Sequence, residues 1–336
     1  MLRRRWLWAA AAVLGACGRE PDLVVYCALD RDYSEPILER FEQHTGLRVQ
    51  AQFDVEQSKT VGLVNRIIQE AARPRADVFW NNEIAHTIRL KNLGLTEAYA
   101  SDMTRGIPEQ FRDAGGHWTG FGARARVIAY RADRFAPGEG PPRSVLRMVE
   151  PEHARRGAMA APLTGTTLTH FTALAVLRGR EALLEWLRRG LDNGLQYGGG
   201  NADVMRRVNE KDLAWCLTDT DDAAAARRNG HPVTVLFPDQ GPDEMGTVLI
   251  PNSVCIVKGA RHRSHAERFV DFVTSPEVES LLAAGGAQQI PLRPGVAAPP
   301  DVPVPGQDFH VATIDWNAVA LQLEERRRDF EELLVR

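Results

Sequence analysis

The stretch LVVYCALDRDYSEPILERFEQHTGLRVQAQF, residues 23–53, decides the fold of this chain. Residues 23–28 form a short apolar run, which predicts a buried strand. The triplet Ser34-Glu35-Pro36 is typical of a helix start, and the helical spacing of apolar residues ends at Gly46. Residues 47–53 alternate apolar and polar side chains, which predicts a second strand. This strand–helix–strand unit is typical of a mainly parallel sheet covered by helices.

The same alternation continues outward along the chain. A helix opened by Ser58, a strand at 76–80 and a helix at 84–93 follow. Two long extended stretches, 118–130 and 246–258, enclose a second α/β set. That set consists of strands 158–162, 213–217 and 233–237 and helices 167–177, 181–190 and 202–208. The remainder is predicted as helices 265–274, 276–284 and 316–334, with a Pro-rich loop at 291–305.

This order predicts an α/β protein with two lobes joined by two extended crossings, the arrangement of a clamshell. Each lobe should be a mixed, mainly parallel sheet flanked by helices. We assign residues 23–123 and 252–288 to lobe 1, and residues 124–251 and 289–336 to lobe 2.

Composition agrees with this organisation and excludes some functions. The chain has 336 residues, of which 25% are charged and 44% hydrophobic, and its net charge is −3. This length is typical of two lobes rather than one core. A nucleic-acid-binding protein would normally carry a basic domain, so we expect no nucleic-acid partner.

The N-terminus has the features of a targeting segment. Arg3, Arg4 and Arg5 precede an apolar run at 6–15 that is too short to span a bilayer. The next residues, Leu-Gly-Ala-Cys at 14–17, resemble a bacterial lipobox. We therefore predict a lipoprotein signal peptide at 1–16, lipidation of Cys17, a tether at 17–22, and anchoring to a membrane in the periplasm or at the cell surface. A plain secretory signal is the alternative.

The remaining cysteines are Cys27, Cys216 and Cys255. An odd number cannot all pair internally, and none has CxxC spacing. Each lies in an apolar, strand-like run, so we expect buried small side chains rather than disulfides or metal ligands.

Several polar turns follow predicted strands. In open α/β sheets, ligands bind beyond the carboxyl ends of the strands, so these turns should meet at one cleft. Thr164, Gly165 and Thr166 precede a helix, and so does the glycine run before Asn201; a helix N-terminus with hydroxyls and amides is an anion site. Helix capping explains each turn equally well when it is taken alone.

The turn at 218–222 carries three carboxylates, Asp219, Asp221 and Asp222, between a strand and a helix. Helix capping with dipole complementarity explains one or two of them. A hard cation held by oxygen ligands and a ligand with an ammonium group are the other two interpretations.

Five stretches of the chain resemble a known family. They are LVVYCALDRDYSEPILERFEQHTGLRV (23–49), RADVFWNNE (75–83), FGARARVIAYR (121–131), VLIPNSVCIVKGARHRSHAERFVDFVTSPEVESLLA (248–283) and TIDWNAVA (313–320). Their order and spacing resemble the bacterial extracellular solute-binding proteins of the ferric-iron-binding family. The resemblance implies a type II periplasmic-binding-protein fold and a role as the capture component of an ABC importer, with a permease and an ATPase as partners.

The metal ligands of that family do not transfer directly. Its members usually hold iron(III) with two adjacent tyrosines, a histidine and a glutamate. The tyrosine pair falls on Thr220 and Asp221, the histidine on Asp30 and the glutamate on Asn82. In this chain Asp30, Asp221 and Asp222 would have to supply the metal-binding oxygens.

The positions at which the family binds a synergistic phosphate or carbonate are better retained. They are Arg124, Thr164, Gly165, Thr166 and Asn201. We therefore expect a cleft with a carboxylate pole and an anion-binding pole, matched to opposite ends of one solute.

We expect a monomeric binding protein without a required cofactor, which captures ferric iron together with carbonate or phosphate. A phosphonate, a phosphorylated molecule or a zwitterion is the alternative solute. A sensory binding module and an enzyme are less favoured, and neither G-x-S-x-G nor H-E-x-x-H is present to support hydrolysis.

Overall fold

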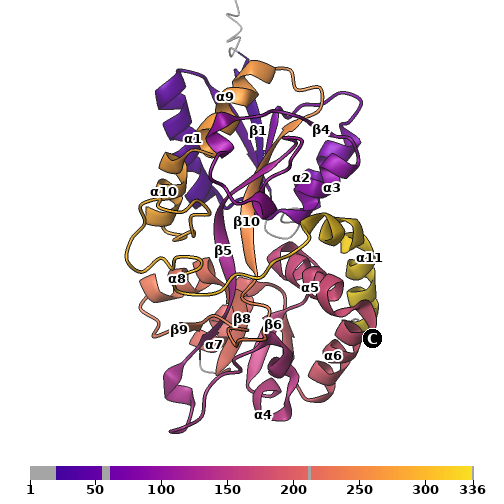
Figure 1. Ribbon diagram of the computed structural model, residues 1–336, viewed down its shortest axis with the longest axis vertical. Coiled ribbons are helices and arrows are strands. Elements are labelled where there is room, and N and C mark those ends of the chain that lie inside the picture. Colours follow the sequence, from indigo (N-terminus) through magenta and orange to yellow (C-terminus); the bar gives the residue numbers. More distant parts are fainter. Residues whose placement is uncertain (1–19, 55–60, 211–212, 335–336) are drawn as a thin grey trace, which may run out of the picture.

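The computed structural model describes residues 20–54, 61–210 and 213–334. Figure 1 shows two lobes stacked along the long axis of the molecule, with strands β5 and β10 running from one lobe into the other. This is the predicted two-lobe α/β architecture. The predicted signal peptide, Cys17, most of the tether and the helix start at Ser58 lie outside the described residues.

The first lobe is built on the strand–helix–strand unit of the opening stretch. Strand β1 (Leu23–Cys27) pairs in parallel with β2 (Val49–Phe53) across helix α1 (Arg31–Thr45). Gly46 ends α1 at φ +70°, in the left-handed region that favours glycine. The helix begins three residues before the predicted start at Ser34, because the amides of Tyr33 and Ser34 already donate to the carbonyl of Asp30.

The rest of this lobe completes the sheet in the order β2-β1-β3-β10. Strand β3 (Val78–Asn81) is parallel to β1, whereas β10 is antiparallel to β3 and to the short β4 (Thr96–Glu97). Helices α1, α9 (Arg263–Val273) and α10 (Pro276–Ala284) cover one face. Helices α2 (described over Val61–Gln69) and α3 (Ala85–Asn92) cover the other (Figure 1).

The second lobe has the strand order β5-β8-β6-β7, with β9 paired to β5. Strand β6 (Gly157–Ala160) is parallel to β7 (Gln196–Gly198) and to β8 (Trp215–Asp219). A Cβ on Gly157 would lie 2.1 Å from the indole of its neighbour Trp215, so only glycine fits this close approach.

Helices cover both faces of the second sheet. Helices α7 (Asn201–Asn209) and α8 (Thr220–Arg228) pack on one face, and α5 (Gly165–Arg178) and α6 (Arg180–Asp192) on the other. The short elements are β9 (Thr234–Leu236), α4 (Pro151–Ala154) and the 3-10 helices η2 (Asp102–Thr104), η3 (Glu109–Phe111), η4 (Ala132–Arg134) and η5 (Val145–Val149).

The two crossings are the antiparallel strands β5 (Thr119–Tyr130) and β10 (Leu249–Val257). Their register shifts between Pro251 and Asn252, and Gly122 has φ +42° beside this shift. The side-chain amide of Asn252 donates to the carbonyl of Gly122 and to Oε1 of Gln289 (2.6 Å). Three separate parts of the chain therefore meet at one irregular point between the lobes.

The terminal helix α11 (Trp316–Leu334) contacts both lobes. Glu324 pairs with Arg89 of α3 (2.9 Å), and Asp329 pairs with Arg180 of α6 (2.5 Å). Sequence alone placed this helix in lobe 2. It lies beside α5 and α6 but also beside α3, as Figure 1 shows.

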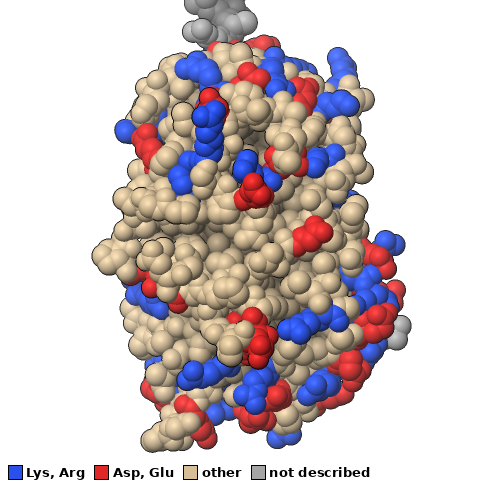
Figure 2. All heavy atoms as spheres, viewed as in Figure 1, with Lys and Arg blue, Asp and Glu red and all other residues tan. Residues whose placement is uncertain are grey.

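Cys27, Cys216 and Cys255 are free and buried, as the sequence predicted. Among the described residues, no helix has both the length and the apolar character needed to cross a bilayer. Figure 2 shows basic and acidic side chains interspersed over both lobes of the viewed face, with few of either sign across the middle.

Candidate functional site

A cavity of about 310 Å³ lies where polar turns from the two lobes meet. Nine of the ten residues that the sequence singled out for ligand binding line it. They are Asp30, Asn82, Arg124, Thr164, Gly165, Thr166, Asn201, Asp221 and Asp222. The expectation that Asp221 and Thr164 face the same cavity is therefore confirmed.

The strand order explains this convergence. Strands β6, β7 and β8 are parallel neighbours, and each is followed by a helix that starts at the cavity: α5, α7 and α8. The carboxyl ends of parallel strands share one edge of a sheet, so the three helix N-termini point at the same space. Asp30 and Asn82 come from the first lobe, where they follow β1 and β3.

Three carboxylates meet in this space. One oxygen from each of Asp219, Asp221 and Asp222 lies within 4.8 Å of the others. Helix capping does not explain Asp219, because its side chain, at the N-cap of α8, makes no capping hydrogen bond. Carboxylate oxygens at this separation suit a hard cation.

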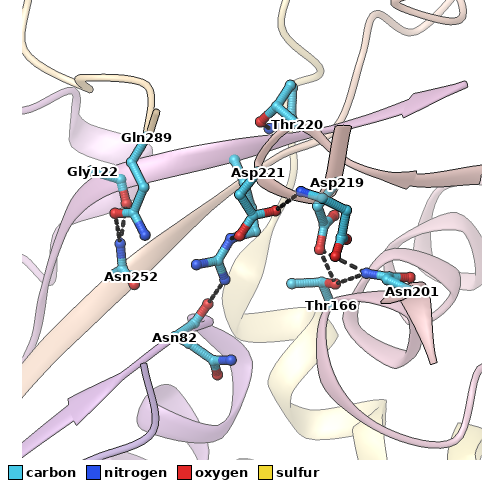
Figure 3. Close-up of polar contacts among 12 residues, drawn as sticks. Asn82, Gly122, Thr166, Asn201, Asp219, Thr220, Asp221, Asn252 and Gln289 are labelled. Carbon is cyan, nitrogen blue, oxygen red and sulfur yellow. Dashed lines mark hydrogen bonds and ion pairs between the residues drawn. The ribbon is translucent and has the colours of Figure 1, made fainter. Parts of the chain in front are cut away.

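Asp219 is held by three residues from three elements. Its Oδ1 accepts from Nη1 of Arg126 (2.7 Å), and its Oδ2 accepts from Oγ1 of Thr166 (2.6 Å) and Nδ2 of Asn201 (2.8 Å). Figure 3 shows Thr166 and Asn201 pointing at Asp219. We call Asp219, Arg126, Thr166 and Asn201 the Asp219 cluster. Arg126 is fully buried and Asp219 is 3% exposed, so this ion pair is screened little by water.

Arg124 makes the second ion pair, at the boundary between the lobes. Its Nε lies 3.0 Å from Oδ2 of Asp221, and its Nη1 donates to the backbone carbonyl of Asn82 (2.6 Å). Asp221 and Asn82, the two partners of this guanidinium group, are labelled in Figure 3. Arg124 was expected in the anion-binding pole, whereas the structure pairs it with a carboxylate of the protein.

The expected separation into a carboxylate pole and an anion-binding pole is wrong. Asp219 accepts hydrogen bonds from Thr166 and Asn201, two residues expected to bind the anion. The cause is the register of the antiparallel β5–β8 ladder, which places Asp219 directly opposite Arg126. Cross-strand partners project their side chains on the same face of the sheet, so the carboxylate lies among the residues that were expected to bind an anion.

Thr220 is the predicted site residue that lies outside the cavity. Its Oγ1 accepts from the amide of Ala125 (3.2 Å), and it lines a different, smaller pocket together with Val235 and Phe237. Figure 3 shows Thr220 directed away from the group around Asp219. It is the first residue of α8, where the chain leaves the alternation of the strand.

Tyr33 and Tyr197 lie close in the sequence to turns that line the cavity, but neither residue lines it. Tyr33 is half-buried; burial raises the pKa of its phenol, and Arg228 and Asp221 lie near enough to act on it. Tyr197 is half-buried within the second lobe with its hydroxyl near the position of Gly190, and burial raises its pKa as well.

Arg126, Thr167 and His170 also belong to the site and were not predicted from the sequence. Arg126 carried a usable signal: it follows Arg124 by two residues in an apolar strand, so both project from the same face. Two arginines on one face of a buried strand require two carboxylates, which the turn at 219–222 supplies.

Asp222 is the carboxylate with the most perturbed titration. Burial raises its pKa to about 8, and the neighbouring Asp221 and Asp219 add to this effect. Its Oδ2 accepts a hydrogen bond from Thr218 (2.8 Å), which opposes the shift. The folded protein therefore holds a proton at Asp222 at pH values where the unfolded chain has lost it.

We expect Asp222→Asn to remove a pH dependence of stability. The folded pKa lies above the ordinary value of 3.8, so the stabilisation is fully present below that value and is lost as pH rises towards about 8. In this window the free energy of unfolding of the wild type should fall, relative to the variant, by up to about 1.4 kcal/mol per pH unit. The measurement is urea unfolding of both proteins, with a chelator present, at several pH values across the window.

Asp32→Asn is the control for this prediction, because Asp32 is exposed on α1. It should leave the pH profile of the wild type unchanged. Parallel profiles for wild type and Asp222→Asn would show that Asp222 is ionised in the folded protein throughout the window.

Comparison with known proteins gives a consistent result. A family model of bacterial extracellular solute-binding proteins matches residues 37–309. The major ferric iron-binding protein of Neisseria meningitidis is 25% identical over 303 residues, which cover 88% of each chain.

Two solved structures share the fold. The apo ferric ion-binding protein A of Pasteurella haemolytica superposes with a TM-score of 0.81 at 23% identity, covering 93% of this chain and 97% of the other. The periplasmic binding protein AfuA of Actinobacillus pleuropneumoniae, solved with fructose-6-phosphate bound, superposes with a TM-score of 0.77 at 22% identity, covering 92% and 96%.

Proposed function

Because this chain belongs to the bacterial extracellular solute-binding protein family, we propose that it is the solute-binding component of an ABC importer and that its cavity captures ferric iron. The observation that carries the proposal is the meeting of Asp219, Asp221 and Asp222 within 4.8 Å in a cavity that Asp30 of the other lobe also lines. Iron(III) is a hard cation, for which carboxylate oxygens are suitable ligands. The relative in Neisseria, named as a ferric iron-binding protein, supports the same cargo.

Asp30, Asp221 and Asp222 are the proposed ligands of the metal. No two tyrosines are adjacent in this chain, and the resemblance places the family's tyrosine pair on Thr220 and Asp221. Carboxylates supply the negative charge that phenolates would otherwise bring. An iron complex of this protein should therefore lack the strong visible absorption of tyrosinate–iron proteins.

A phosphonate, a phosphorylated molecule or a zwitterion is the second candidate solute. It is favoured by the N-termini of α5, α7 and α8, which meet at the cavity, because the positive end of a helix dipole attracts an anion. The structural neighbour with bound fructose-6-phosphate supports this candidate. Against it stand the hydrogen-bond donors of Thr166 and Asn201, which already contact Asp219.

Thermal unfolding with candidate solutes tests the proposal. Metal-free protein is heated with iron(III) supplied as its citrate or nitrilotriacetate chelate, with each chelator alone as the control, and separately with an aminoalkylphosphonate and a sugar phosphate. A true ligand at 100 to 1,000 times its dissociation constant should stabilise the protein by about 3–4 kcal/mol. Stabilisation by the organic phosphorus compounds and not by iron(III) would replace the first candidate with the second.

We propose that the lobes close on the solute by hinge motion. The proposed lobes are residues 23–123 with 252–288 and residues 124–251 with 289–336. Their boundaries fall at the point where Gly122, Asn252 and Gln289 meet, which supports a hinge there. The closed form would then be recognised by the permease, which acts with an ATPase.

The proposed location is the periplasm or the cell surface, with the chain anchored to a membrane through lipidated Cys17. The protein is proposed to act as a monomer and without a nucleic-acid partner. No catalytic role is proposed, because the family is one of solute-binding proteins.

A further inference from the structure

We infer that Asp219 is the built-in counter-anion of the cavity, so that the protein takes its cation without a co-bound anion from solution. This inference rests on the proposed function, since it concerns how the same cavity binds a cation. The observation behind it is the occupation of an anion-binding position by a side chain of the protein.

The Asp219 cluster has the donors of an anion site. A guanidinium group, a hydroxyl and a side-chain amide converge from β5, α5 and α7, and all three donate to the two oxygens of Asp219. The N-termini of α5 and α7 add positive electrostatic potential at the same place. A carboxylate from solution would find the same donors already used.

Arg126 makes this arrangement rigid. Its Nη2 donates to Thr167 (3.2 Å) and its Nε to Nδ1 of His170 (3.3 Å). His170 accepts this hydrogen bond and must be neutral, in agreement with its pKa, which burial and the charge of Arg126 hold well below the ordinary value. The remaining Nη1 donates to Asp219. A fully buried guanidinium group needs one anion, and Asp219 supplies it.

The charge balance of the cavity also favours binding of a cation without an anion from solution. Arg126 is paired with Asp219 and Arg124 with Asp221. Asp30 and Asp222 line the same space in addition, so four carboxylates face two guanidinium groups. Even with one of these four carboxylates protonated, an anion from solution would add to an existing excess of negative charge, whereas a cation would offset it.

Displacement of Asp219 by an outside anion is unfavourable for the same reason. Its carboxylate belongs to the last residue of β8, opposite Arg126, and leaving this position would break its hydrogen bonds with Arg126, Thr166 and Asn201. If it left Arg126, it would remain buried near Asp221 and Asp222 with no cation to compensate it.

The experiment uses terbium(III) chloride as a hard trivalent cation whose counter-ion is a poor ligand. The purified, metal-free protein is titrated with it by calorimetry, with and without millimolar acetate. Wild-type affinity should change by less than about twofold when acetate is added. Asp219→Ala should bind terbium about 10- to 100-fold more weakly, the usual cost of removing a group that supports a metal site.

Acetate distinguishes a counter-anion from a purely structural side chain. In Asp219→Ala it can enter the space left by the carboxylate and should restore most of the lost affinity. In Asp219→Asn the amide fills that space, so affinity should fall without recovery in acetate. Asp133→Ala is the matched control, because Asp133 is an exposed carboxylate that pairs with Arg131 just after the end of β5. This variant should bind terbium like the wild type.

Three results would count against the inference. A wild type whose affinity rises tenfold or more in acetate would show that an outside anion is required. Loss of affinity in Asp219→Ala without recovery in acetate would reduce Asp219 to a structural residue. Absence of terbium binding by every protein, with or without acetate, would overturn the proposed cation cargo itself. The first and third results can be read from the wild-type titration alone, so the inference stays testable even if a variant fails to fold.

Discussion

Replacement of Arg126 by leucine is expected to lower the free energy of unfolding by about 3–5 kcal/mol, the usual cost of removing one partner of a buried ion pair. The change leaves the carboxylate of Asp219, which is 3% exposed, without a cation in the protein interior. It also removes the donors to Thr167 and His170. Urea unfolding of wild type and variant, in the presence of a chelator, measures the difference.

Two further variants test the cause of this loss. Arg31→Leu removes an exposed arginine that pairs with Glu35, and it should cost less than about 1 kcal/mol. Arg126→Leu combined with Asp219→Leu should be more stable than Arg126→Leu alone, because it leaves no unpaired charge. A double variant that is less stable than the single one would show that packing around Arg126, rather than its charge, dominates.

Replacement of Asp221 by alanine is expected to weaken cation binding by about 2–5 kcal/mol, the range found when one partner of a buried charge pair is removed. Two effects add. The cavity loses a proposed metal ligand, and the guanidinium group of Arg124, which is 3% exposed, is left facing the cation without its partner. Calorimetric titration with terbium(III) chloride or iron(III) nitrilotriacetate measures the loss.

Thr220→Ala is a close control for this variant. Thr220 precedes Asp221 directly, yet it lines a different pocket, so its removal should leave the affinity for the cation unchanged. Thermal unfolding of both variants shows whether each remains folded. Equal affinities for Asp221→Ala and the wild type would remove Asp221 from the proposed set of ligands.

The element order could be read from the sequence because it depends on local patterns. The apolar runs at 23–28 and 213–217 and the amphipathic stretches between such runs correspond to β1, β8 and the helices that follow them. Strands β4 and β7 were missed, since two or three residues are too few to show a period. The early start of α1 was missed because Pro36 suggested a first turn, whereas the carbonyl of Asp30 begins the helix.

Much of the candidate site could also be predicted. Turns after neighbouring parallel strands must meet at one sheet edge, so Thr164, Asn201 and Asp221 were correctly placed together. The direction of each side chain could not be predicted. Thr220 and Asp221 are adjacent, but Asp221 faces the cavity and Thr220 does not, because α8 begins at Thr220, inside the acidic turn.

The sequence by itself determined that two α/β lobes would bring hydroxyls, amides and carboxylates to a common cleft, since hydrophobic periodicity and the geometry of parallel strands are enough for that result. Only the tertiary structure decided which charges neutralise each other. Arg126 meets Asp219 because β5 and β8 pair in one particular antiparallel register, and Arg124 meets Asp221 because a helix starts one residue after that strand ends. Register and helix phase depend on contacts between segments about 90 residues apart, and a local sequence pattern does not specify them.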